Sequence, residues 1–273
     1  MLINHQSVSR KKCYETCAQQ YKFRYHLKIL RPGEEPFYFT YGTIVHRVAE
    51  LYVLNKGEES VGDIANKILR GKYDLDDKGR KCPPMPDDLT KRFQKNLRAL
   101  QKLTDRIGLG GIVEHKFEYD LDPPHNRTVL GFLDRLILGK DKAFIIDYKT
   151  TKRGKWRVNK NTVSQDLQLR TYSRVIQREF GIKPENIKAA LYYFEGEEIV
   201  GCTYSEESLL AAEKELLDSY KAIERADPDK VWGKVSWQCK TCDYNTLCTF
   251  YSSSGYGDMP AFDGNMDNLG GGW

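Results

Sequence analysis

Two apolar segments joined by the short sequence "GKDK" constrain the fold of this 273-residue chain more than any other feature. The segments "TVLGFLDRLIL" and "AFIIDYK" are typical of consecutive β-strands, and a hairpin between them places Asp134 opposite Asp147. Strand alternation puts Asp134 on one face with four apolar residues, Leu130, Phe132, Leu136 and Leu138. A carboxylate there is costly unless it is paired, and two facing carboxylates repel. The pattern therefore predicts a divalent cation between them.

A lysine follows the second carboxylate on the same face of the strand. Lys149 lies two residues beyond Asp147, where it can orient a water molecule or neutralise charge on a phosphoryl transition state. An Asp–Lys ion pair at the end of a strand is the structural alternative. Glu114 in "GIVEHKF" is either a further acidic group near this site or an exposed residue of an alternating strand.

The rest of the chain alternates between helical and strand periodicity. Helices are predicted over 8–29, 43–55, 87–107, 163–180 and 205–226, and further strands over 111–121, 187–194 and 197–204. Ser205 suits the N-cap of the last helix. This order indicates an α/β core with a helical N-terminal insertion and a cysteine-bearing C-terminal module. The segment 252–273, rich in Gly and Asp, is predicted to be a disordered tail.

Composition and charge narrow the class of protein. No apolar run approaches the roughly eighteen residues of a membrane span, and the first residues lack the apolar region of a secretory signal. We expect a soluble cytoplasmic protein without a membrane partner. A net charge of +5 permits a polyanionic partner without requiring one.

Seven cysteines, an odd number, argue against a disulfide framework. The spacing Cys239-x2-Cys242-x5-Cys248 indicates a metal or cluster site that needs a fourth thiolate, from Cys17 or Cys13. The residues alone leave a zinc ion and an iron–sulfur cluster equally open.

The motifs at the two strands resemble a known family. "GFLDRL" followed by "IIDYKTT" is similar to the core of the PD-(D/E)xK nuclease superfamily, in its RecB-like branch. "GTIVHRVAE", which contains His46, "DLQLRTYS", which contains Gln168 and Tyr172, and the opening "SVSRKKCYETCAQQYKFRY" resemble further motifs of that branch in the same order. The resemblance spans about residues 7 to 250. It implies a restriction-endonuclease-like mixed sheet flanked by helices, in a single nuclease domain over 1–251.

The resemblance also implies roles for the site residues. Mg²⁺ or Mn²⁺ would be bound by His46, Asp134, Asp147 and a backbone carbonyl near Tyr148. Lys149 would orient the attacking water, and Gln168 and Tyr172 would hold Lys149 or the phosphate. The implied activity is a metal-dependent deoxyribonuclease, an exonuclease on single-stranded or free DNA ends that leaves 5′-phosphates, with a role in recombination or repair.

The cysteines match one group within that branch. The iron–sulfur nucleases of CRISPR adaptation and the AddB-type subunits have a similar arrangement of one early and three late cysteines around a [4Fe–4S] cluster. This resemblance assigns Cys17, Cys239, Cys242 and Cys248 as ligands, in a module formed by the first helix and residues 236–251. Cys13 is the alternative to Cys17, and zinc is the alternative to the cluster.

A basic loop follows the catalytic strand. Lys152, Arg153, Lys155 and Arg157 surround Trp156, a composition that suits phosphate contacts and base stacking, although a solvated surface loop has the same composition. Two rival functions remain: a non-catalytic DNA-binding or assembly subunit that keeps the fold, and cleavage of RNA. The tail is a candidate contact for a replication or recombination protein, or a solvated segment.

Overall fold

The computed structural model describes residues 1, 3–30, 37–76, 79–151, 154 and 157–254. These residues form two compact units. We call the described part of 4–8 and 34–222 the sheet unit, and that of 1–3, 9–33 and 223–273 the cysteine unit. The single nuclease domain over 1–251 stays a prediction. Most of the predicted tail, and with it the predicted partner contact, lies outside the described residues.

A five-stranded mixed sheet forms the centre of the sheet unit, as the sequence predicted. Its strands lie in the order of the chain: β1 (Ile112–Asp122), β2 (Arg127–Leu138), β3 (Ala143–Lys149), β4 (Ile187–Tyr193) and β5 (Glu198–Cys202). Neighbouring strands are antiparallel except β3 and β4, which are parallel. A parallel pair needs a crossover, and α6 (Leu167–Phe180) supplies it.

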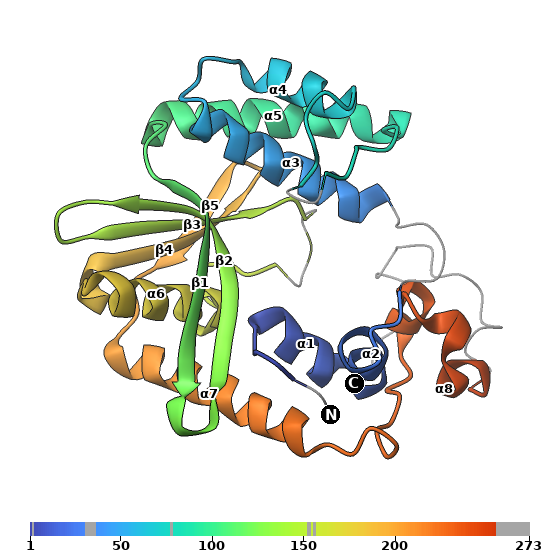
Figure 1. Ribbon diagram of the computed structural model, residues 1–273. Coiled ribbons are helices and arrows are strands. Elements are labelled where there is room, and N and C mark those ends of the chain that lie inside the picture. The colour runs from blue at the N-terminus through green and yellow to red at the C-terminus, as the bar shows by residue number, and fades with distance from the viewer. Residues whose placement is uncertain (2, 31–36, 77–78, 152–153, 155–156, 255–273) are drawn as a thin grey trace. The chain divides into compact units, whose positions relative to one another are not determined.

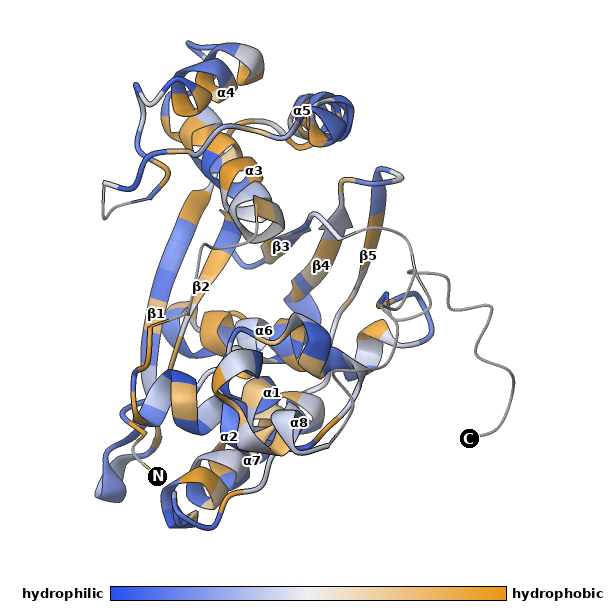
Figure 2. Ribbon diagram, turned by 90° about the vertical axis from the view of Figure 1, so that its right-hand side faces the viewer, coloured by the Kyte–Doolittle hydropathy of each residue, from blue (hydrophilic) through white to orange (hydrophobic). Residues whose placement is uncertain are grey.

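Helices cover both faces of this sheet (Figure 1). One face carries α3 (Phe37–Leu54), α4 (Val61–Leu69) and α5 (Asp87–Ile107), and the other carries α6 and the part of α7 (Glu206–Arg225) that belongs to the sheet unit. The amphipathic pattern of α5 explains its placement, because Phe93, Leu100 and Leu103 are buried. Figure 2 views α5 end-on, with a hydrophilic side and an apolar side that faces its neighbours.

Each face of the sheet has its own apolar core. Ile145 of β3 packs in a cluster with Leu169 of α6 and Leu209 of α7, whereas its neighbour Ile146 packs in a cluster with Ile44 of α3. A strand buried on both faces reads as a continuous apolar run. This burial explains why "AFII" shows no alternation.

The β2–β3 hairpin has the predicted register. Its ladder ends at the pair Arg135↔Ile146, so the next position brings Asp134 opposite Asp147. The β2–β3 ladder ends there, and farther along β2 an isolated bridge pairs Val129 with Gln6 instead. The two carboxylates therefore lie at a fork in the sheet.

The predicted alternation along β2 is wrong beyond Asp134. Leu133 and Leu136 belong to the same core cluster and Leu138 packs against it, whereas Phe132 is exposed. The facing of β2 shifts by one residue at Asp134, where the β1–β2 ladder is also interrupted. Asp134 consequently does not share a face with Leu136 and Leu138.

The cysteine unit consists of short helical segments. The single helix predicted over 8–29 is broken into α1 (Val8–Thr16), α2 (Ala18–Tyr21) and a π-helical turn at Lys22–His26. Cys17 causes the break, because its backbone is extended, with φ −161° and ψ 111°. In the C-terminal part, 3-10 turns at Trp237–Thr241 and Asn245–Leu247 precede α8 (Thr249–Ser252). Across the described ranges, no helix is long and apolar enough to span a membrane.

Candidate active site

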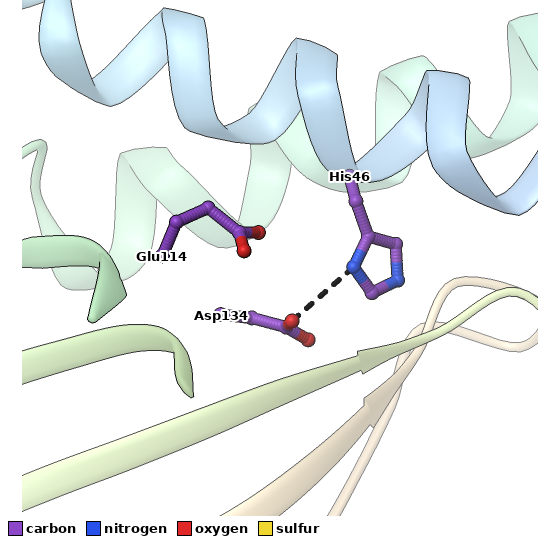
Figure 3. Close-up of side chains that lie close together, drawn as sticks. All are labelled: His46, Glu114 and Asp134. Atoms are coloured by element: carbon purple, nitrogen blue, oxygen red, sulfur yellow. Dashed lines mark ion pairs between the residues drawn. The ribbon is translucent and has the colours of Figure 1, made fainter. Parts of the chain in front are cut away.

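The fork between β2 and β3 holds the first part of the site. The carboxylate of Asp134 accepts a hydrogen bond from the backbone N–H of Tyr148 at 2.6 Å, which fixes one of its oxygens. Its other oxygen lies 3.2 Å from Nδ1 of His46, which extends from α3 (Figure 3). Tyr148 also packs its ring edge-on against the imidazole of His46, with 5.9 Å between ring centroids. Residues of α3 and β3 thus fix the position of Asp134 on β2.

Glu114 completes a group that can hold a metal ion. One ligand atom from each of His46, Glu114 and Asp134 lies within 4.8 Å of the other two, and the three side chains converge in Figure 3. Glu114 has φ +48°, a conformation that costs a residue with a side chain about 1–3 kcal/mol. The β1–β2 register skips it, between Val113↔Arg135 and His115↔Leu133. Backbone strain therefore coincides with a carboxylate directed into the site, which sequence alternation alone left undecided.

The charges of this group influence one another. Burial by itself lowers the pKa of His46, but the charge and hydrogen bond of Asp134, together with the charges of Asp147 and Glu114, outweigh it and raise that pKa to about 9. Burial raises the pKa of Asp134, whereas His46 and the Tyr148 N–H lower it by more. An acidic pocket that attracts a proton also attracts a cation, and imidazole ligates a metal only after losing that proton.

A second chain of polar contacts runs from β3 to α6. Oδ2 of Asp147 lies 2.6 Å from Nζ of Lys149. Lys149 donates a hydrogen bond to Oε1 of Gln168 at 2.9 Å, and Gln168 donates one to the hydroxyl of Tyr172 at 2.8 Å. Asp166 caps the start of α6 by accepting from the N–H of Leu169. The cap and the spacing of four residues place Gln168 and Tyr172 on one face, directed at Lys149.

Asp147 is buried, with only 3% of its surface exposed. Burial, reinforced by the charge of Asp134, raises the pKa of Asp147 to about 6 against the opposing effect of Lys149. Burial lowers the pKa of Lys149, but the charge and hydrogen bond of Asp147 outweigh this and raise it. The Asp–Lys ion pair considered from the sequence is therefore present, and it lies beside the group that can hold a metal ion rather than at an isolated strand end.

The structure brings together most of the predicted site residues. Asp134 and His46 lie in one group, and Asp147, Lys149, Gln168 and Tyr172 form the adjacent chain. Tyr148 contributes its N–H, and its carbonyl as a ligand stays a prediction.

The predicted nucleic-acid loop is only partly described. Lys152, Arg153, Lys155 and Trp156 lie outside the described residues. The guanidinium of Arg157 stacks on the ring of Tyr193, with its Cζ 3.4 Å from the ring centroid, and donates to the carbonyl of Glu195 at 3.1 Å. Only 9% of its side chain is exposed. In this arrangement Arg157 contacts protein groups, and its role in binding DNA stays a prediction.

The cysteine unit contains a separate cavity of about 240 Å³. Four cysteines line it, one from the break between α1 and α2 and three from the C-terminal turns: Cys17, Cys239, Cys242 and Cys248. Burial raises the pKa of Cys242, so its thiolate needs a bound cation to be stable. Cys13 does not line the cavity, and its Sγ instead lies 3.8 Å from Oε1 of Gln20.

The spacing of these thiols is wider than that of a tetrahedral zinc site. Tetrahedral geometry with Zn–S bonds of about 2.3 Å places sulfur atoms about 3.8 Å apart. A metal ion can be held where three or more His, Cys, Asp or Glu ligand atoms all lie within 4.8 Å of one another. Among the described residues, His46, Glu114 and Asp134 form the one such set. No three thiols here are that close.

Comparison with protein families matches residues 5–249 with the PD-(D/E)XK nuclease superfamily. The chain belongs to this superfamily. Among solved structures, that of a "putative exonuclease" from Eubacterium rectale is similar over 89% of this chain and 88% of that chain, with 15% identity and a TM-score of 0.51. At this identity the similarity establishes the fold. SSO0001 shares 14% identity over 85% of this chain and 95% of that chain, with a TM-score of 0.35. No curated protein matches.

Proposed function

We propose that the protein is a divalent-cation-dependent deoxyribonuclease of the RecB-like branch. One observation carries the proposal: a three-residue group that can hold a metal ion lies beside a buried Asp–Lys pair at the fork of the sheet. Superfamily membership supports it independently. A non-catalytic DNA-binding or assembly subunit is the alternative, but such a subunit does not need His46, Asp147 and Lys149 to remain together.

The donor set fits Mg²⁺ or Mn²⁺. Carboxylate oxygens suit both ions, and the imidazole of His46 favours Mn²⁺ relative to an all-oxygen site. A bound cation would supply Lewis-acid chemistry and shield the negative charge of the scissile phosphate. His46, Glu114 and Asp134 would hold it, and Asp147 lies at the next position across the fork.

The remaining residues of the site position a water molecule and the phosphate. Gln168 accepts from the ammonium of Lys149 and so restricts its direction. Lys149 can then orient the attacking water and neutralise the charge that develops on the phosphate. Tyr172 receives the amide N–H of Gln168, which keeps the oxygen of that amide directed at Lys149. In-line attack that expels the 3′-oxygen leaves a 5′-phosphate.

We further propose single-stranded or free DNA ends as the substrate, as the RecB-like motifs imply. The similar "putative exonuclease" agrees with this assignment.

For the cysteine unit we propose a [4Fe–4S] cluster bound by Cys17, Cys239, Cys242 and Cys248. A cluster presents a separate iron to each thiolate, so it suits thiols that are spaced more widely than zinc requires. Because Cys17 and Cys239 are far apart in sequence, a group bound by both would restrain the unfolded chain as a long-range crosslink does. Its role would be structural.

The test is a cleavage assay on protein purified without oxygen. Single-stranded and double-stranded DNA, and RNA of the same sequence, each labelled at the 5′ or the 3′ end, are incubated with Mg²⁺, with Mn²⁺ or with EDTA. We expect cation-dependent loss of DNA ends by the wild type and by Asp141→Asn, whose side chain is exposed in the β2–β3 turn, and none by Asp147→Asn. Cleavage that persists equally in Asp147→Asn would contradict the proposal, and DNA binding without any cleavage would favour the non-catalytic subunit.

A further inference from the structure

An aromatic side chain borders the metal-binding group without belonging to either core. Phe132 lies two residues before Asp134 on β2, and 47% of its surface is exposed. On the other face of the same strand, packing is tight. Leu133 is fully buried, and a Cβ added at Gly131 would lie 2.4 Å from the ring of Phe117. β2 therefore presents Phe132 outward at the point where it carries a site carboxylate.

Phe132 lines a cavity of about 450 Å³ together with His46, Glu114 and Asp134. This volume falls within the range of about 300–1,000 Å³ that is typical of ligand sites. The opposite wall comes from α3 and includes Arg47, whose guanidinium lies 2.7 Å from Glu50. Exposed aromatic residues are common singly. Phe132 differs because its cavity also contains the group that can hold a metal ion.

A lysine side chain lies next to the ring of Phe132 on the neighbouring strand. The β1–β2 register pairs Phe132 directly with Lys116, so both extend from the same face of the hairpin. Lys116 is exposed, and among the described residues it has no ion-pair partner. A planar apolar ring with an adjacent ammonium matches the two parts of a nucleotide, since the base stacks on an aromatic face and the phosphate attracts a lysine.

We propose that Phe132 and Lys116 form a subsite for the nucleotide next to the scissile phosphate of single-stranded DNA. Phe132 stacks on the base and Lys116 contacts a backbone phosphate. This subsite deepens the proposed nuclease function and rests on it. A base can stack on Phe132 only where one of its faces is not covered by a neighbouring base, so the subsite favours single-stranded DNA over the interior of a duplex.

The test measures binding separately from cleavage. Oligonucleotides of single-stranded DNA that carry 2-aminopurine at successive positions from one end are titrated with protein in Ca²⁺ and, in parallel, in EDTA. We expect fluorescence quenching at one position with the wild type and with Phe132→Trp. Phe132→Ala is expected to abolish this quenching and to weaken binding by about tenfold or more. Phe180→Leu, which alters a phenylalanine of α6 that is 40% exposed, should behave as wild type.

Lys116→Gln addresses the phosphate contact. Removing one phosphate contact to single-stranded DNA reduces the slope of log Kd against log salt concentration by about 0.7. Glu118→Gln, at another exposed position of β1, should not reduce it.

The outcomes separate this proposal from the nuclease function. Unchanged affinity and quenching in Phe132→Ala would overturn the subsite, even if the wild type cleaves DNA. If the wild type binds DNA but does not cleave it, the nuclease function fails. The affinities of wild type and Phe132→Ala for single-stranded DNA then still show whether Phe132 contacts a base. A wild type that binds no oligonucleotide overturns both.

Discussion

The two candidate sites of the molecule are held together in different ways. At the fork of the sheet, strand register and hydrogen bonds hold the side chains of Asp134, Lys149 and Gln168 in place. In the cysteine unit, short helical turns surround a cavity lined by four cysteines, which are separated by more than a shared metal ion would allow for any three of them among the described residues. The first site is organised by the fold, whereas we propose that a bound cluster organises the second. This difference predicts which changes alter chemistry and which alter stability.

The largest expected effect is on cleavage by Lys149→Met. Methionine keeps much of the volume but removes the charge directed at the phosphate, so we expect single-turnover cleavage to slow by about 100- to 1,000-fold or more. Because Asp147 already has a raised pKa, it can take up a proton when its partner is lost, and the protein should remain folded. Lys142→Met, in the exposed β2–β3 turn, is the control and should cleave normally. Near-normal cleavage by Lys149→Met would remove Lys149 from the mechanism.

The next effect concerns stability rather than chemistry. Cys242→Ser removes one of the four thiols, so we expect loss of iron and of the broad visible absorption, with a decrease in Tm of about 5–10 °C. Mn²⁺ binding at the sheet unit, measured by calorimetry, should be unchanged because none of its ligands is a cysteine. Cys82→Ser, a residue that packs against the α3–α5 core, should retain its iron. Equal iron content in wild type and Cys242→Ser would contradict the assignment of this cavity.

A smaller effect on cleavage is expected from changing Gln168, which positions Lys149. Gln168→Leu removes one of the two acceptors of Lys149 and leaves Asp147 as the other. It changes no group proposed to contact substrate, so we expect kcat to fall by about 10- to 100-fold with little change in KM. Gln165→Leu, at an exposed position just before α6, is the matched control. A rise in KM alone would show that Gln168 contacts the substrate instead.

The smallest effect is a gain in stability. Glu114 adopts a positive φ, so Glu114→Gly should raise the free energy of unfolding in EDTA by about 0.5–1 kcal/mol while it weakens Mn²⁺ binding. Glu118→Gly lies on the same strand at ordinary φ and should lower the free energy of unfolding. Denaturant titration compares the two variants. Destabilisation of both by the same amount would mean that no strain is stored at Glu114.

Much of the site could be predicted from the sequence because it depends on local register. The turn "GKDK" fixes the pairing of β2 with β3, and this pairing brings Asp134 opposite Asp147. The helical spacing of Gln168 and Tyr172 likewise places both on one face. The position of Lys149 beside Asp147 could be predicted in the same way, because residues two apart in an extended strand lie on the same face.

Other features depended on tertiary structure and could not be predicted. The direction of Glu114 into the site accompanies its positive φ opposite Asp134, and in the same region β2 departs from the predicted alternation. The helix α4 was missed, although Ser60 accepts from the N–H of Asp63 as an N-cap does. The break at Cys17 interrupts a segment of helical periodicity without a Gly or Pro to indicate it.

The central claim is that the fork of the sheet binds a catalytic cation, and anomalous diffraction from crystals soaked in Mn²⁺ tests it most directly. We predict an anomalous peak within bonding distance of a ring nitrogen of His46 and carboxylate oxygens of Glu114 and Asp134. Fully occupied Mn²⁺ elsewhere in the crystal, with no peak among these three residues in protein that cleaves DNA, would contradict the account.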